Sequence, residues 1–212
     1  METQTEVIKQ GTWEWLEQRR GKFTASAVHH LMGKRGMGKT GETYVMEKVT
    51  EELGVPIPEV SSYAMQHGTE WEPMARQYYE IAFKCEVEQV GFIIASWCPD
   101  AGCSPDGFVR DTNKMIEIKC PYNPVVHTKH LLIKSAADLL ELHPEYYWQI
   151  QMGMAVTGKS ACDFVSFHPE FSGWKRMISI EIKPNEADII LLKHRISEAV
   201  QMKNEILKQI EL

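Results

Sequence analysis

The clearest pattern in the chain is helical and lies at the C-terminal end. Asn185 can cap a helix there. The apolar positions that follow recur about every 3.6 residues: Ile189, Leu192, Ile196, Val200 and Leu207. Helices are also predicted over residues 144–156 and over residues 67–83, with Pro73 tolerated in the first turns of the latter.

Three further helices are predicted near the N-terminus, each after a threonine that can cap it. They follow Thr12, Thr24 and Thr40. The second is expected to end at Gly33 in a left-handed conformation, and the third at Leu53.

Five apolar runs have the length and composition of β-strands. They cover residues 86–95, 102–110, 114–119, 161–168 and 176–183. The residues Asp111-Thr112-Asn113 are typical of a hairpin turn between the second and third runs. The order of elements predicts an α/β fold, with one central mixed β-sheet flanked by helices, in a single domain over residues 1–212.

Composition sets limits on the class of protein. With 212 residues, 43% hydrophobic and 25% charged, the chain is typical of a globular domain. No run approaches the roughly 20 apolar residues of a membrane span, and the first residues lack the parts of a signal peptide, so a cytosolic protein is expected. The five cysteines include no CxxC pair, which argues against a disulfide framework or structural zinc.

Charge is unevenly distributed along the chain. The formal net charge of −6 argues mildly against a general nucleic-acid binder. However, residues 17–41 hold six Lys or Arg and one acid, whereas residues 42–59 hold five Glu and one Lys. Three of these cations, Lys34, Arg35 and Lys39, lie in the Gly-rich segment 33–41, which we call the basic loop.

The segment with the clearest chemistry is Ser104-Pro105-Asp106-Gly107 followed by Glu117-Ile118-Lys119. Alternate residues of a strand share a face, so Glu117 and Lys119 point the same way and Ile118 points into the core. A hairpin between Phe108 and Met115 would bring Asp106 and Glu117 together, where two carboxylates repel each other unless a cation lies between them.

Hard oxygen ligands of this kind suit Mg²⁺ or Mn²⁺, and such ions promote phosphodiester hydrolysis. Lys119 would orient the attacking water, help deprotonate it, or stabilise developing charge. An isolated Glu-x-Lys is common on exposed strands, so the prediction depends on the upstream aspartate and the hairpin.

These segments resemble the PD-(D/E)xK nuclease superfamily, and more narrowly the phage exonucleases of the lambda exonuclease, or YqaJ-type recombinase, family. SPDG at 104–107 and EIKCP at 117–121 carry the resemblance. Further segments match in order: TWEWL at 12–16, RRG at 19–21, TAS at 24–26, HGTEWE at 67–72 and YYWQIQ at 146–151. The resemblance implies a nuclease-like fold with a core at about 13–168, completed by a strand and helix over 176–209.

The resemblance also implies the catalytic groups. The metal ligands would be Asp106, Glu117, Glu72 and the main-chain carbonyl of Ile118. They would bind Mg²⁺, with Mn²⁺ as a substitute, at two ions per active site. Lys119 would be the catalytic lysine. Glu70 remains an alternative to Glu72. The two residues lie nearly opposite on a helix, so only one of them is expected to face the metals.

A pocket for the DNA 5′-phosphate is implied as well, formed by Arg19, Ser26, Ser104 and Gln149. An arginine fork with hydroxyl and amide donors suits a terminal phosphate, and Ser26 would lie in the first turn of a helix, which favours an anion. Further DNA contacts are expected from Lys34, Arg35, Lys39, Thr24 and Tyr146.

The expected function is a metal-dependent 5′-to-3′ exonuclease of double-stranded DNA. It would digest the 5′-phosphorylated strand to mononucleotides and leave a 3′ overhang for phage-type recombination by single-strand annealing. By the same resemblance, it would form a homotrimeric ring around DNA, act with an annealing protein, and work in the cytoplasm of a bacterial host as a phage or prophage product.

Two alternatives stay open at this point. One is a PD-(D/E)xK endonuclease of restriction or repair type, with the same metal site but no pocket for a DNA end. The other is a non-catalytic DNA-end-binding module on the same fold. The presence of Asp106, Glu117 and Lys119 together disfavours the second alternative.

Overall fold

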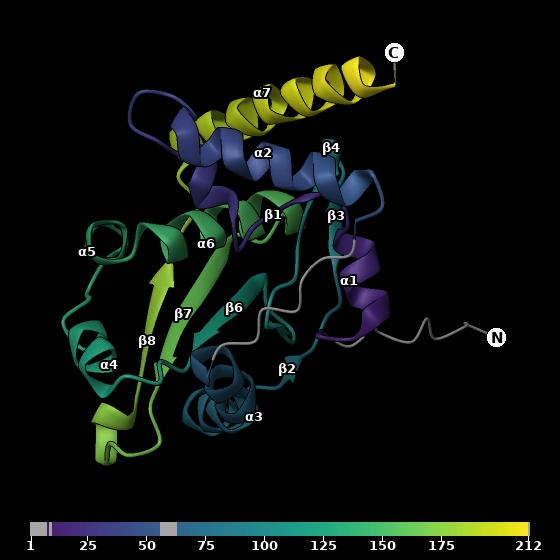
Figure 1. The fold of residues 1–212 in the computed structure, drawn as a ribbon. Coiled ribbons are helices and arrows are strands. Elements are labelled where there is room, and N and C mark those ends of the chain that lie inside the picture. The colour runs from purple at the N-terminus through teal and green to yellow at the C-terminus, as the bar shows by residue number, and fades with distance from the viewer. Residues whose placement is uncertain (1–7, 9, 56–62, 212) are drawn as a thin grey trace.

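Two β-sheets form the centre of the protein in a computed structural model, which describes residues 8, 10–55 and 63–211 (Figure 1). The smaller sheet has the order β1-β4-β3, formed by Phe23–Thr24, Cys98–Cys103 and Ile93–Ala95. The larger has the order β2-β5-β6-β7-β8, formed by Val87–Glu88, Gly107–Val109, Lys114–Lys119, Ala161–Phe167 and Met177–Ile182. The α/β fold and the mixed sheet are confirmed, but the prediction of one sheet was wrong.

The β5–β6 hairpin forms as predicted. Phe108 pairs with Met115 in an antiparallel ladder, and Asp111 adopts a positive φ of 58° in the turn. β6 then pairs in parallel with β7, which makes the larger sheet mixed. The predicted run 102–110 is split between the two sheets, because Pro105 has no N–H for a ladder hydrogen bond.

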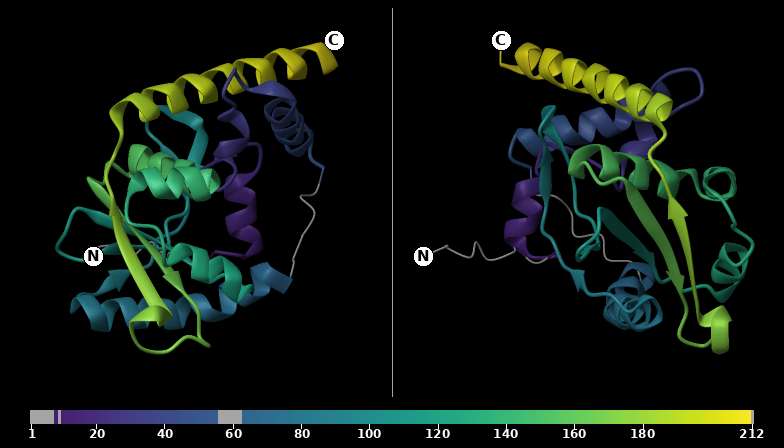
Figure 2. Two further views of the ribbon diagram at one scale, coloured as in Figure 1. Left: turned by 90° about the vertical axis from the view of Figure 1, so that its left-hand side faces the viewer. Right: turned by 180° about the vertical axis from the view of Figure 1, so that it is seen from behind.

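Helices cover both faces of the larger sheet (Figures 1 and 2). α3 (Tyr63–Phe83) packs on one face through the apolar cluster that contains Ile116 and Ile118. α6 (Pro144–Thr157) packs on the other, where Met115 joins the main core. α2 (Gly38–Glu52) and α7 (Glu186–Ile210) form a layer beyond α6, with the two helices side by side.

Glu117 and Lys119 both lie on the face of the larger sheet that α6 covers, as the alternation of residues along β6 predicted.

The N-terminal segment differs from the prediction. α1 (Trp13–Arg19) begins at Thr12, which caps it as expected by accepting from Trp15 N–H. Thr24, however, lies in β1, because β1 pairs with β4, and only a short 3-10 helix, η1 (Val28–Leu31), follows. Gly33 does not adopt a positive φ, whereas Gly36 and Gly38 do.

Helix boundaries shift elsewhere. α2 starts at Gly38, so Thr40 lies within it rather than capping it. α3 starts at Tyr63, which puts Pro73 inside the helix rather than in its first turns. Two helices and a 3-10 turn were not predicted: α4 (Pro124–His130), α5 (Ala136–Leu142) and η2 (Gly173–Arg176).

The predicted run 86–95 is split between the two sheets as β2 and β3, whereas the cap predicted for the C-terminal helix is confirmed. Asn185 caps α7 through its side chain. All five cysteines are free thiols. Among the described residues, no helix is both long and apolar enough to cross a membrane.

The packing of α7 gives a test of the C-terminal helix. Leu192 is fully buried in the main core, whereas Ile190, two residues before it, is 69% exposed. We expect Leu192→Ala to lower the free energy of unfolding by about 2–5 kcal/mol and Ile190→Ala to change it by less than about 0.5 kcal/mol, as measured by chemical denaturation. Equal effects at both positions would contradict this packing.

Candidate active site

Three carboxylates meet where β5 begins and β6 ends. Asp106, directly before β5, accepts a hydrogen bond at Oδ2 from the Ile118 N–H at 2.6 Å. Glu117 is 2% exposed, and its Oε1 accepts from Lys119 Nζ at 2.6 Å. The hairpin therefore brings together the two carboxylates and the ammonium that the sequence predicted.

Glu72 joins these residues from α3. Its carboxylate pairs with Arg76, one turn later, and Arg76 Nη2 also donates to the backbone oxygen of Asp106 at 3.3 Å. Glu70 is exposed on a different side of the helix. Of the two candidate glutamates, Glu72 is therefore the one next to Asp106. We call Asp106, Glu117 and Glu72 the acid cluster.

Burial and the charge of Asp106 raise the pKa of both glutamates of the acid cluster. Burial raises the pKa of Glu117 to about 8, and the charge of Asp106 adds to the increase. Burial likewise raises the pKa of Glu72 to about 7, again with a contribution from Asp106. The pKa of Asp106 is also raised by burial, although Lys119 opposes this.

Lys119 carries the balancing charge. Burial alone would lower the pKa of Lys119, but Glu117 and Asp106 raise it above its ordinary value, so the side chain is an ammonium. Its Nζ also donates to Gln149 Oε1 at 3.1 Å and lies 4.8 Å from the Tyr146 ring centre. The ammonium thus has a fixed position over the acid cluster.

The acid cluster fits a hard divalent cation by its donor chemistry. Carboxylate and carbonyl oxygens are the ligands that Mg²⁺ and Mn²⁺ prefer, and a cation would relieve the repulsion that raises the pKa of Glu72 and Glu117. Within the described part of the chain, no three His, Cys, Asp or Glu side chains are already arranged as a metal site. The oxygens accept from Arg76, Ile118 and Lys119 instead, so a cation would replace these partners.

A second group of polar side chains surrounds Arg19 at the end of α1. Arg19 Nη2 lies 3.3 Å from Ser26 Oγ and 3.5 Å from Thr24 Oγ1. Its guanidinium stacks on Trp15, with 4.0 Å from Cζ to the ring centre, and Trp15 Nε1 donates to Ser104 Oγ at 3.0 Å. Arg19, Ser26 and Ser104 are the side chains predicted to bind a terminal phosphate, and we call them the phosphate pocket.

Gln149 lies between the phosphate pocket and the acid cluster. Its Nε2 donates to Glu117 Oε1 at 2.6 Å, so its direct contacts are with Glu117 and Lys119. Gln149, Ser104 and Glu117 nevertheless line one small cavity. The pocket predicted for a terminal phosphate and the predicted metal site are therefore adjacent.

Two details of the phosphate pocket differ from the prediction. Ser26 lies in a turn before η1, so it has no helix N-terminus to offer an anion. Trp15 was not predicted as a site residue, although its position four residues before Arg19 on a helix is a signal for contact.

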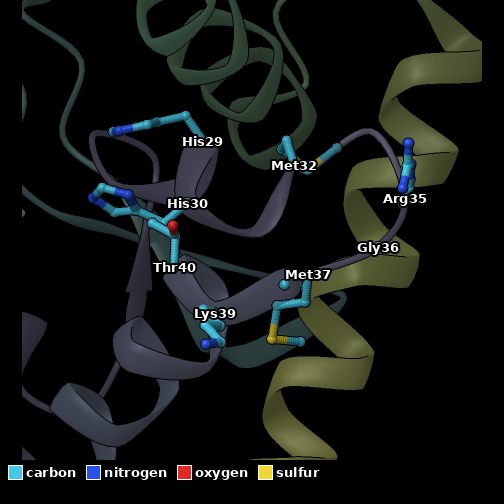
Figure 3. Close-up of a pocket in the computed structure, with 10 residues that line it drawn as sticks. His29, His30, Met32, Arg35, Gly36, Met37, Lys39 and Thr40 are labelled. Carbon is cyan, nitrogen blue, oxygen red and sulfur yellow. The ribbon is translucent and has the colours of Figure 1, made fainter.

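The five predicted DNA contacts do not form one surface. Lys34, Arg35 and Lys39 are exposed, but Lys39 lies in the first turn of α2 rather than in a loop. Arg35 and Lys39 line an open pocket of ≈ 420 Å³ between η1 and α2 (Figure 3). Thr24 is buried beside Arg19. Tyr146 lies next to Lys119 and stacks on His143, rather than packing with the neighbouring aromatic residues of its own helix.

Comparison with known proteins identifies relatives. The profile of the YqaJ-like viral recombinase domain matches residues 14–160. An alkaline exonuclease (LHK-Exo) from Laribacter hongkongensis is 32% identical with a TM-score of 0.83, and the match covers 94% of this chain and 96% of that one. The structure of LHK-Exo in complex with dAMP matches equally well, at 33% identity, a TM-score of 0.83 and the same coverage.

A more distant likeness concerns the fold alone. A phage-related exonuclease from Haemophilus somnus 129PT is 14% identical with a TM-score of 0.75, over 89% of this chain and 96% of that one. No match is found among curated protein sequences.

The raised pKa of Glu117 predicts a specific pH dependence of stability without metal. The folded state binds this proton up to a pKa of about 8, whereas the unfolded chain releases it near 4.5, so the stability contribution is lost as the pH rises between these values. The measured quantity is the free energy of unfolding of the wild type minus that of Glu117→Gln, in EDTA. This difference should fall from pH 5 to 8 by up to about 1.4 kcal/mol per pH unit and stay constant above pH 8. If the free energy of unfolding changes with pH in the same way in both proteins, Glu117 does not have a raised pKa in the folded state.

Proposed function

The chain belongs to the YqaJ-like viral recombinase domain family, and we propose that it is a metal-dependent 5′-to-3′ exonuclease of double-stranded DNA. It digests the 5′-phosphorylated strand to mononucleotides. The remaining strand is a 3′ overhang for phage-type recombination by single-strand annealing.

One observation carries the proposal: Ser104 of the phosphate pocket, Gln149 and Glu117 of the acid cluster line one cavity. An endonuclease needs no pocket for a chain end beside its hydrolytic centre. The similarity to an alkaline exonuclease, a protein whose structure has been determined with dAMP, supports the same activity.

The acid cluster and the Ile118 carbonyl would hold Mg²⁺, or Mn²⁺ in its place, with Glu72 toward a second ion. Bound there, Mg²⁺ would lower the pKa of a water molecule and offset charge on the phosphate oxygens. Lys119, an ammonium on the same strand face, donates hydrogen bonds to the water or to a phosphate oxygen and stabilises charge that develops in the transition state.

The bond changes determine the products. The water oxygen forms a bond to phosphorus while the bond from phosphorus to the 3′ oxygen breaks. The first nucleotide leaves with a 3′ hydroxyl, and the next nucleotide retains a new 5′-phosphate. Arg19, Ser26 and Ser104 would bind that phosphate, so each cycle regenerates the end that the pocket recognises.

The assembly and partners are part of the proposal. A homotrimeric ring around DNA would reconcile the net charge of −6 with DNA binding, because the basic loop can face the DNA while acidic surfaces face outward. The proposed partner is a single-strand annealing protein, and the proposed location is the cytoplasm of a bacterial host.

The direct test uses three substrates: linear duplexes with and without a 5′-phosphate, and a closed circle, each with Mg²⁺ or EDTA. The proposal expects Mg²⁺-dependent loss of the 5′-phosphorylated strand, slower digestion of the hydroxyl end, and an intact circle. Cutting of the circle would favour an endonuclease. Binding of DNA ends without hydrolysis in Mg²⁺ or Mn²⁺ would favour an end-binding module.

Lys119→Met tests the catalytic lysine. We expect hydrolysis to fall by about 100- to 1,000-fold or more, because one pre-positioned donor is lost. Binding of DNA ends, measured by fluorescence anisotropy, should change little. Lys114→Met, on the same strand and 34% exposed, is the matched control and should retain activity. Substantial cleavage by Lys119→Met would remove its catalytic role.

Arg19→Gln tests the phosphate pocket. Loss of a charge-assisted contact should reduce the preference for 5′-phosphorylated over 5′-hydroxyl ends by about 10- to 100-fold. Arg20→Gln is the control, since Arg20 pairs with Glu17 and not with the pocket. A preference that survives in Arg19→Gln would place the recognition of the 5′-phosphate elsewhere.

A further inference from the structure

Lys203 of α7 is a buried cation outside the proposed active site. Only 2% of its side chain is exposed, yet each of its three ammonium hydrogens has an acceptor. The acceptors are Asp100 Oδ1 at 2.6 Å, Glu52 Oε2 at 3.1 Å and the backbone oxygen of Gly21 at 3.1 Å. Burial alone would lower the pKa of Lys203, but Asp100 and Glu52 raise it, so the side chain remains charged.

The same glycine is held from its other side. Gly21 N–H donates to Glu51 Oε2 at 2.9 Å, and the second oxygen of Glu51 accepts from Lys48 Nζ at 2.5 Å. Gly21 has a positive φ of 67°, and a side chain at this position would collide with the Glu52 carboxylate. Charged side chains from α2 and α7 thus bind both the backbone N–H and the backbone oxygen of Gly21. We call Gly21, Lys203 and Glu51 the Gly21 clamp.

The Gly21 clamp lies inside the segment that builds the phosphate pocket. Gly21 is two residues after Arg19 and three before Thr24, so it sets how the guanidinium meets the hydroxyls of Thr24 and Ser26. α1, which carries Arg19, has no buried residue to anchor it in the core. The hydrogen bonds to Gly21 are therefore a main constraint on the end of this helix.

We infer that Lys203 and Glu51 are positioning residues for recognition of the DNA 5′-phosphate: by fixing Gly21, they hold the Arg19 guanidinium where a terminal phosphate can accept its hydrogen bonds. Neither residue contacts DNA in this account. The inference depends on the proposed function of the phosphate pocket. It adds that the specificity for the chain end is controlled from α2 and α7, neither of which carries a residue of the phosphate pocket.

The test compares four variants of the full-length protein: Lys203→Met, Glu51→Leu, Glu51→Gln and Lys114→Met. Each is assayed for kcat and KM on linear duplexes with 5′-phosphate and 5′-hydroxyl ends, at a temperature where circular dichroism shows it folded. Glu51→Gln keeps an oxygen that accepts from Gly21 N–H. Lys114→Met removes an ion-paired lysine that has no part in the Gly21 clamp.

Lys203→Met and Glu51→Leu should reduce the preference for the 5′-phosphate about tenfold or more, through a higher KM for the phosphorylated duplex, because a displaced guanidinium binds the phosphate poorly. Their rates on the hydroxyl duplex should stay within about twofold of wild type. Glu51→Gln and Lys114→Met should keep the wild-type preference.

An unchanged preference in folded Lys203→Met and Glu51→Leu would overturn the inference. Equal losses on both substrates would also overturn it, since that is the effect of a purely structural role. If Lys203→Met does not fold, Glu51→Leu decides, because it leaves the contacts of Lys203 in place. A wild-type protein without any preference would overturn the phosphate pocket and the Gly21 clamp together, whereas a wild-type preference that survives in the variants overturns the clamp alone.

Discussion

The active site depends on holding carboxylates close together where water can barely reach them. Glu117 is 2% exposed on β6, beside Asp106, and the charge of Asp106 adds to the burial that raises the pKa of Glu117 and of Glu72. This arrangement is unfavourable for the protein alone, and the surrounding groups reflect that: Arg76, Lys119 and Gln149 are all directed at a carboxylate oxygen. The same repulsion would give a divalent cation its affinity, so the strain in the metal-free protein and the proposed catalytic power would have one origin.

Strand order places the proposed phosphate pocket next to this acidic cluster. β1 pairs with β4, and the chain leaves β4 through Ser104 to reach Asp106 at the start of the hairpin. The N-terminal segment with Arg19 therefore lies against the residues that lead into the acid cluster. A nucleic-acid end has a phosphate to be bound and a phosphodiester to be hydrolysed a short distance apart, and the proposed function assigns one of these two regions to each.

Local patterns were predictable, and long-range pairing was not. The β5–β6 hairpin could be predicted because the turn and the alternation of Glu117, Ile118 and Lys119 are encoded within a few residues. The cap predicted at Thr24 was wrong because pairing of β1 with β4, far along the chain, outcompeted a local helix signal. The choice between Glu70 and Glu72 needed the structure, since the phase of a helix is set by the face that packs on the sheet. The Gly21 clamp was equally hidden, because Lys203 lies at the other end of the sequence from Gly21.

The most direct test of the central claim is anomalous diffraction from crystals soaked in Mn²⁺. The account predicts a peak within coordination distance of carboxylate oxygens of Asp106 and Glu117 and of the Ile118 carbonyl, and loss of that peak in Asp106→Asn. A fully occupied Mn²⁺ site elsewhere, with Lys119 still paired to Glu117 and no peak at the acid cluster, would contradict it.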